Sequence, residues 1–334
     1  MPELPEVERA AALVRVLANG KRIDRVETTQ DNLVFSGITH EEFSSEVSGR
    51  LVKNAARYGK CFYIELDGSG RIPVLHFGMT GMLQVRGRST PQYRSNVGDP
   101  DGVWPPRFVK FILHIQNDDC DPVEIAFCDA RRLGRIRLVA SPLTEPPISE
   151  LGFDPVLSMP SLENFQSSVL KRTCPIKALL LDQSFSAGVG NYLADEILYQ
   201  AKVHPEQRCN TLANDQVQAL HQQVADVCRI AVQVNADDSK YPEHWLFKHR
   251  WGKGKKAKST MKLHSGELAD IRWVTVGGRT SAYVPQIQKL PTKRKRHDEV
   301  CEESDVEQRR SKRQRSKVHD VAHVLSYLME LPTP

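Results

Sequence analysis

Residues 186–196 read SAGVGNYLADE, and this stretch decides how the second half of the chain folds. Gly188 and Gly190 allow another part of the backbone to come close, and Asn191 stands where a helix would begin. Backbone N–H groups at a helix start can bind a phosphate, and Asn191 would add a side-chain donor. The same residues also suit a packing turn between two helices. A nucleotide-triphosphate loop is disfavoured, because its lysine is missing after the turn.

Apolar residues recur at helical spacing on both sides of this turn. Pro175 opens the helix before the turn, and Val217, Leu220 and Val224 share one face of a helix after it. The second half of the chain is therefore predicted to be helical. We expect helices at 161–171, 175–181, 191–201 and 213–234.

The first half of the chain has a different period. A helix is expected after Pro5, ending at Asn19-Gly20, and beyond it apolar residues alternate with polar ones. Short strands without intervening helices favour an antiparallel sandwich or barrel. We expect strands at 22–28, 51–57, 61–66, 72–77, 82–86, 107–115, 123–128 and 135–139.

These patterns predict an α+β protein with a β domain followed by a helical domain. Gly277-Gly278 separates two further strands and predicts a hairpin within 273–284. Residues 292–334 are of low complexity and strongly charged, so we expect disorder there, with a short amphipathic helix at 321–331. The expected divisions are a domain at 1–141, a proline-rich linker at 142–160, a helical domain at 161–240, a basic segment with the hairpin at 241–291, and the tail at 292–334.

Composition limits the classes of function. The 334 residues are 40% hydrophobic and carry a net charge of +5, which suits nucleic acid only where the charge is clustered. No run of 18 apolar residues predicts a membrane span, and acidic residues interrupt any N-terminal signal sequence. Without secretion, the seven cysteines are expected to be reduced thiols. They include no C-x-x-C pair, so we expect no structural zinc site.

The chain begins Met1-Pro2-Glu3, which allows two interpretations. Removal of Met1 would leave a terminal proline, a secondary amine able to attack a sugar carbon and form an iminium. Glu3 could move protons for that amine. Alternatively, Pro2 and Pro5 only open a helix, and these residues alone favour that simpler reading.

Three turns carry side chains that could reach DNA. Arg131, Arg132 and Leu133 follow one strand, and paired arginines beside an apolar residue could enter a duplex as a wedge. Met79 is either a core residue or an exposed apolar plug. Arg279, at the tip of the expected hairpin, could reach a backbone phosphate. Each of these residues could equally lie on an ordinary solvated turn.

Taken in order, six blocks of this chain resemble the formamidopyrimidine-DNA glycosylase/endonuclease VIII family. They span residues 1–286, and the form of the hairpin and the basic tail are most similar to the plant and fungal branch. The blocks are MPELPEVE, RYGKCFYIEL, HFGMTGML, DARRLGRIRL, PIKALLLDQSFSAGVGNYLADEILYQAKVHP and GGRTSAYVPQ.

The resemblance implies an N-terminal β-sandwich domain, a helix–two-turn–helix domain and a finger hairpin that lacks zinc. It also implies a DNA glycosylase with lyase activity, which needs no metal or cofactor. Pro2 matches the nucleophile and Glu3 the general acid/base. The strand would be cut by β- and then δ-elimination.

Further roles are carried over from the matched motifs. Lys60, Asn191 and Arg279 match residues that grip the phosphate beside the lesion, and Lys60 and Arg279 also match residues that assist elimination. Lys177 matches a lysine close to the DNA backbone. The partner implied is double-stranded DNA with a damaged base, which must leave the stack before its sugar can be attacked.

The void left by the flipped base would be filled by Met79, Arg131 and Leu133, and Arg132 is expected to contact DNA. Two departures from the family pattern concern this loop. Leu133 replaces a common phenylalanine, and Ala130 replaces a proline, so selectivity for the opposite base is uncertain. Because the bacterial loop that closes over 8-oxoguanine is not matched, we expect weak activity on 8-oxoguanine and a preference for ring-opened purines and hydantoins.

The sequence alone leaves two other functions open. One is an endonuclease VIII-like preference for oxidised pyrimidines, and the other is a binder of damaged DNA without catalysis. The basic clusters within 293–317 have the spacing of a bipartite nuclear import signal, although a tether to DNA would look the same. We expect a monomer in the nucleus that an import receptor recognises.

Overall fold

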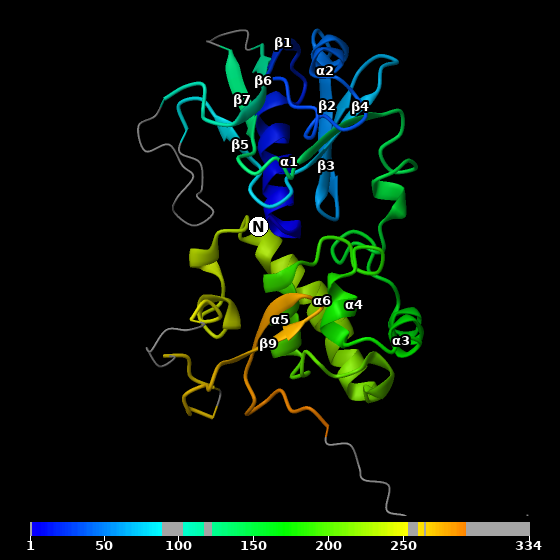
Figure 1. Cartoon of the computed structure of the whole chain (residues 1–334), viewed down its shortest axis with the longest axis vertical. Coiled ribbons are helices and arrows are strands. Elements are labelled where there is room, and N and C mark those ends of the chain that lie inside the picture. Colours follow the sequence, from blue (N-terminus) through cyan, green and yellow to red (C-terminus); the bar gives the residue numbers. More distant parts are fainter. Residues whose placement is uncertain (1, 89–102, 117–121, 253–259, 264, 292–334) are drawn as a thin grey trace, which may run out of the picture. The chain divides into compact units, whose positions relative to one another are not determined.

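Alternating apolar residues form the predicted antiparallel strands in the first half of the chain (Figure 1). The computed structural model describes residues 2–88, 103–116, 122–252, 260–263 and 265–291. The strands of the first half form two four-stranded sheets. The strand order is β1-β6-β7-β5 in the first sheet and β2-β3-β4-β8 in the second. The strands are β1 Ile23–Thr28, β2 Val52–Tyr58, β3 Cys61–Leu66, β4 Ile72–His76, β5 Met82–Val85, β6 Val109–Ile115, β7 Val123–Cys128 and β8 Arg135–Val139.

A row of aromatic side chains joins the two sheets into a sandwich. Phe62 of β3 packs on Phe77 with ring centroids 5.1 Å apart, and Phe77 stacks on Phe127 of β7 at 5.6 Å. Phe127 in turn stacks on Phe111 of β6 at 5.4 Å. All four rings are buried in one apolar core. This confirms the predicted α+β class and its β-sandwich domain.

Helix α1 (Leu4–Ala18) links the sandwich to the helical half of the chain. Glu3 and Glu6 form a capping box at its start, and Pro5 occupies its first turn. Its buried face contacts β2 and β3, and α1 also packs against helix α6 (Asn214–Gln233). The start of the chain is therefore fixed at the meeting point of both halves.

The second half is helical, as predicted. Helices α5 and α6 pack together around a separate apolar core, to which Phe165 of α3 also belongs. Between them the chain turns through residues 201–213, including a short 3-10 helix. The remaining elements are α3 Leu162–Leu170, α4 Ile176–Leu181, α5 Asn191–Gln200 and the 3-10 helices Ile148–Glu150, Cys209–Thr211, Asp238–Lys240 and Leu246–Lys248.

The predicted hairpin follows, with strands β9 (Arg272–Val276) and β10 (Arg279–Tyr283) paired antiparallel. Gly277 and Gly278 form its turn at φ values of 57° and 71°, a conformation that glycine adopts without steric cost. Val276 pairs with Arg279 across the turn. The expected tail and its short helix, 292–334, lie outside the described residues.

One helix of the first half was absent from the sequence predictions. Helix α2 (His40–Val47) was not predicted, although Thr39 and Glu42 form a capping box that a T-x-x-E search would find. Residues 142–160, expected as a linker, are bonded to both halves: Asp154 accepts from Gly59, and Phe153 accepts from Ala187. Across the described ranges, no helix is long and apolar enough to cross a membrane.

Candidate active site

The carboxylate of Glu3 caps the first turn of α5. It accepts hydrogen bonds from the backbone N–H groups of Tyr192 at 3.0 Å and Leu193 at 3.1 Å. These are helix-start donors that the sequence alone offered to a phosphate. Because an internal carboxylate holds them, these two N–H groups are not available to a phosphate.

The glycines of the turn make this contact sterically feasible. A Cβ at Gly190 would lie 2.2 Å from the carboxyl carbon of Glu3, and one at Gly188 would lie 2.8 Å from Leu4. Gly188 also has a φ of 94°. The two glycines of the G-x-G motif therefore let the start of the chain lie against α5. This close packing explains why residues 188 and 190 are glycines.

Burial raises the pKa of the Glu3 carboxyl above its ordinary 4.5, although the Lys60 charge and the two N–H donors oppose this effect. The residue is only 1% exposed. A carboxyl group with a raised pKa can be protonated at a pH where an exposed glutamate is ionised, so it can donate a proton as well as accept one.

Lys60 lies opposite Glu3 at the turn between β2 and β3. Its Nζ donates to the carbonyl of Val189 at 3.0 Å. Burial lowers the pKa of Lys60, Glu3 raises it, and the charge of Arg279 lowers it further. These influences place Lys60, Glu3 and Arg279 within one electrostatic environment, although they come from three separate segments.

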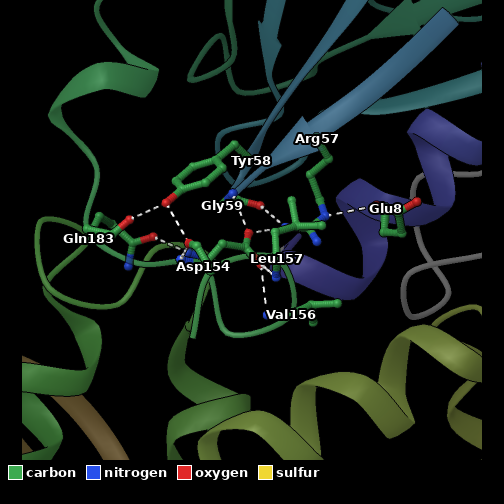
Figure 2. A network of polar contacts seen from close by, with 11 residues as sticks. Glu8, Arg57, Tyr58, Gly59, Asp154, Val156, Leu157 and Gln183 are labelled. Carbon is green, nitrogen blue, oxygen red and sulfur yellow. Dashed lines mark hydrogen bonds and ion pairs between the residues drawn. The ribbon is translucent and has the colours of Figure 1, made fainter. Parts of the chain in front are cut away.

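A buried ion-pair network holds the Lys60 turn in position (Figure 2). The guanidinium of Arg57, only 1% exposed, pairs with Asp154 and with Glu8 of α1, the latter at 3.0 Å. Asp154 also accepts from the backbone N–H of Gly59 at 2.8 Å. The Glu3-bearing helix, the Lys60 turn and the segment after the sandwich are thus tied together.

Asn191 contacts the hairpin at Thr280, the residue that follows Arg279. The side-chain amide of Asn191, the first residue of α5, donates to the carbonyl of Thr280 at 3.0 Å. Arg279 is exposed at the start of β10. The predicted phosphate-gripping residues Lys60, Asn191 and Arg279 are therefore brought together.

The predicted void-filling residues lie on two turns that contact each other. A Cβ on Gly78, next to Met79, would lie 2.4 Å from the backbone of Leu133. Asp129 fixes both turns, because it accepts from Thr80 at 2.8 Å and from the backbone of Arg131 at 3.2 Å. Leu133 is 40% exposed and Arg131 is also exposed, so both side chains are available to a duplex.

Two basic residues expected to contact DNA are instead engaged within the protein. Lys177 is fully buried, and its Nζ donates to Asp195. Arg132 donates from Nε and Nη2 to the carboxylate of Asp31, both at 3.0 Å, while half of its side chain stays exposed. Lys177 is thus placed differently from the sequence expectation, whereas Arg132 could contact a duplex with its exposed part.

Residues 1–136 match the formamidopyrimidine-DNA glycosylase N-terminal domain, and residues 151–243 match the H2TH domain of the same enzymes. Together they cover most of the described chain. The chain belongs to the formamidopyrimidine-DNA glycosylase family. The family comprises DNA-binding repair glycosylases, which accords with the exposed turn that carries Arg131 and with the buried carboxyl of Glu3.

Sequence similarity to individual formamidopyrimidine-DNA glycosylases supports this assignment. The chain is 39% identical over 290 residues to the Arabidopsis thaliana formamidopyrimidine-DNA glycosylase, covering 87% of this chain and 71% of that protein. It is 28% identical over 303 residues to the Pelotomaculum thermopropionicum protein, covering 87% of this chain and all of that one. The Arabidopsis similarity agrees with the expected plant branch.

Solved glycosylases share the fold. The Lactococcus lactis formamidopyrimidine-DNA glycosylase, solved with DNA containing an AP site, superimposes with a TM-score of 0.68 at 22% identity, covering 86% of this chain and 99% of that one. Another structure of the Lactococcus lactis enzyme, a mutant with Fapy-dG DNA, gives 0.68 at 24% identity, covering 86% of this chain and all of that one. The fold of this chain is thus that of the glycosylases.

Some residues of this glycosylase site were missed by sequence reasoning. Glu6 accepts from the backbone N–H of Glu3 at 2.8 Å and from the Tyr192 hydroxyl at 2.8 Å, and its spacing from Glu3 could have signalled the capping box. His76 lies near Lys60, and burial lowers its pKa to about 4, so it is neutral at physiological pH. The residues described include no group of three or more potential metal ligands.

Proposed function

We propose that this protein is a bifunctional DNA glycosylase and AP lyase that removes oxidised purines and then cuts the strand. The observation that carries the proposal is the position of Glu3. Its buried carboxyl, with a raised pKa, directly follows Pro2 and shares its surroundings with Lys60. A proton donor and acceptor therefore stands beside the candidate nucleophile.

In the first step, the secondary amine of Pro2, freed by removal of Met1, attacks C1′ of the damaged nucleotide. The bond from C1′ to the base breaks, and the sugar ring opens to give an iminium between Pro2 and C1′. Protonated Glu3 supplies a proton to the ring oxygen or to the departing base, and its carboxylate accepts one afterwards. The base leaves with the electron pair of the broken bond.

In the second step, the iminium acidifies the hydrogen on C2′. Loss of this proton to a base breaks the bond from C3′ to its phosphate oxygen, which is the β-elimination. A further elimination, with loss of the C4′ proton to a base, breaks the bond from C5′ to its phosphate oxygen, and the phosphate leaves with the electron pair. Lys60, Asn191 and Arg279 would hold the phosphate beside the lesion, and charge-assisted donors of this kind stabilise the phosphate as it leaves.

The substrate class we propose is damaged double-stranded DNA with a formamidopyrimidine or hydantoin, with 8-oxoguanine a weaker substrate. The Lactococcus lactis enzyme has been solved with AP-site DNA and with Fapy-dG DNA, which supports a damaged-DNA partner here. Excision rates on duplexes carrying each lesion test the order. A highest rate on 8-oxoguanine, or on oxidised pyrimidines, would reject the proposed preference.

Borohydride trapping tests the chemistry. The purified protein, with removal of Met1 verified by intact mass, is incubated with abasic-site DNA and borohydride. We expect a covalent adduct that is lost in Pro2→Gly and when Met1 is retained. Absence of an adduct with the processed wild type would remove the lyase and favour a non-catalytic binder of damaged DNA.

A nuclear, monomeric enzyme is the setting we propose. The basic clusters within 293–317 have bipartite spacing, which supports recognition by an import receptor. Fluorescent fusions of the full chain and of a chain with these clusters changed to glutamine would locate the protein. Equal nuclear fractions for both would contradict the import signal, and sedimentation reports the oligomeric state.

A further inference from the structure

Asp195 is a buried carboxylate that the proposed mechanism does not use. It lies one turn beyond Asn191 on the same face of α5 and is 0% exposed. Lys177 of α4 donates to one of its oxygens. Arg250 donates to the other from Nε at 3.1 Å and from Nη2 at 2.6 Å. One buried carboxylate thus joins two buried cations from separate segments.

The same carboxylate holds strand β10. Its second oxygen accepts from the backbone N–H of Ala282 at 3.1 Å. Two residues earlier, the carbonyl of Thr280 accepts from Asn191 at 3.0 Å and from Lys177 at 3.4 Å. The backbone polar groups of alternate residues point to the same edge of a strand, so helices α4 and α5 hold β10 along the edge that β9 does not occupy.

Arg250 connects Asp195 to strand β9 as well. Its backbone carbonyl accepts from the indole N–H of Trp273 at 3.0 Å, and its guanidinium lies 4.3 Å from the ring centroid of Trp251. Both strands of the hairpin are therefore connected to Asp195, one directly and one through Arg250. Residues 241–291 contain no cysteine, so no zinc–thiolate site can hold the finger, and this ion cluster and the small apolar core beside it are two of its anchors.

We propose that Asp195 is the positioning residue that aims Arg279 at the phosphate beside the lesion. Arg279 immediately precedes Thr280, so fixing Thr280 and Ala282 fixes where its side chain starts. Arg279 is near enough to Lys60 for its charge to lower the pKa of that lysine. This inference rests on the proposed function, because that function gives Arg279 its phosphate contact.

A double-mutant cycle separates positioning from general stability. Asp195→Asn, Arg279→Ala and the double variant are compared for strand cleavage at abasic sites. We expect Asp195→Asn to lower kcat/KM at least tenfold in the wild-type background and less than twofold when Arg279 is already alanine. Equal reductions in both backgrounds would overturn the proposal, because Asp195 would then act independently of Arg279.

Asp215→Asn is the matched control, since it removes the same charge from an exposed position in the first turn of α6. It should cleave like the wild type. Because Asp195→Asn leaves two buried cations with a weaker partner, it could fail to fold. Lys177→Met with Asp195→Asn removes one charge of each sign and repeats the cycle with less electrostatic imbalance.

A second readout distinguishes failure of this inference from failure of the proposed function. The same cycle is measured as affinity for a duplex that carries a tetrahydrofuran abasic analogue. If the wild type binds this duplex but forms no borohydride adduct, the lyase proposal fails, while coupling in affinity still supports Asp195. Additive losses of affinity would reject Asp195 even in an active lyase.

Discussion

Gly190 lies directly against the carboxylate of Glu3, so closely that a Cβ at position 190 would stand 2.2 Å from the carboxyl carbon. This contact joins the start of the chain to the turn of α5. A helix start that faces a carboxylate at this distance has no room for a side chain. The carboxylate that we propose as the catalytic acid is therefore accommodated by a glycine from a distant part of the sequence.

Gly190→Ala should displace the Glu3 carboxylate from the N–H groups of Tyr192 and Leu193. We expect base excision to fall at least 100-fold, with a loss of roughly 1–3 kcal/mol in unfolding free energy from overpacking. Single-turnover excision and thermal melting measure the two effects. Gly252→Ala is the control, because its Cβ would meet nothing closer than 3.7 Å. Full excision activity in Gly190→Ala would contradict this role.

Glu3→Gln should separate base removal from strand cleavage. A buried glutamine cannot donate an acidic proton, so we expect excision of an intact damaged base to fall at least 100-fold. A preformed abasic site has no base to remove and should keep a larger share of its cleavage rate. Equal losses on both substrates, measured in single-turnover assays, would argue against a general acid.

The pH dependence of excision follows from the raised pKa of Glu3. The protonated acid is the active form in base departure, so activity is retained below the raised pKa and lost as pH rises through it. The alkaline limb of the rate profile should therefore lie above pH 4.5, the ordinary value for glutamate. The limb should disappear in Glu3→Gln. A wild-type limb unchanged in that variant belongs to another group.

The sequence predicted much of this fold because its signals are local. Period-two alternation located the strands of the sandwich, and the glycine pair located the hairpin turn. Motif resemblance named Glu3, Lys60, Asn191 and Arg279, which the structure brings together. Helix α2 was missed because it is short and only two of its eight residues, Phe43 and Val47, are apolar, although its capping box is visible in the sequence.

Internal ion pairs were the part that the sequence could not reveal. A lysine or arginine in a motif looks like a surface charge, yet Lys177 is paired with Asp195 inside the helical half. Arg57 and Asp154 are 97 residues apart, and nothing in their local patterns indicates that they meet. Such pairs depend on the completed packing of distant segments, which a periodicity does not encode.

Arg57→Met should loosen the attachment of the Lys60 turn. The change leaves the Asp154 carboxylate buried without its cation, and such losses cost about 3–5 kcal/mol of unfolding free energy. Because Asp154 also accepts from Gly59, we expect lyase activity to fall more than tenfold at a temperature where the variant remains folded. Denaturant unfolding and abasic-site cleavage measure these effects.

Arg25→Met is the matched control for Arg57→Met, since the Arg25 side chain is 57% exposed and its acidic partners are also exposed. Surface pairs contribute about 0–1 kcal/mol. The control should therefore unfold and cleave almost like the wild type. Similar destabilisation in both variants would show that burial of the Arg57 pair carries no special weight.

Leu133 should determine how well the protein holds a duplex open after base flipping. The side chain is 40% exposed, and its turn contacts the one that carries Met79. Leu133→Ala shortens the wedge, so we expect kcat/KM for lesion excision in duplex DNA to fall about tenfold, in line with loss of roughly 1–2 kcal/mol of apolar contact. Leu133→Phe enlarges the stacking surface and should sharpen the preference for one opposite base.

Cleavage of a single-stranded abasic substrate is the internal control for the Leu133 variants, because no stack has to be filled there. If Leu133→Ala slows both substrates equally, the side chain supports the fold of the turn rather than the opened duplex.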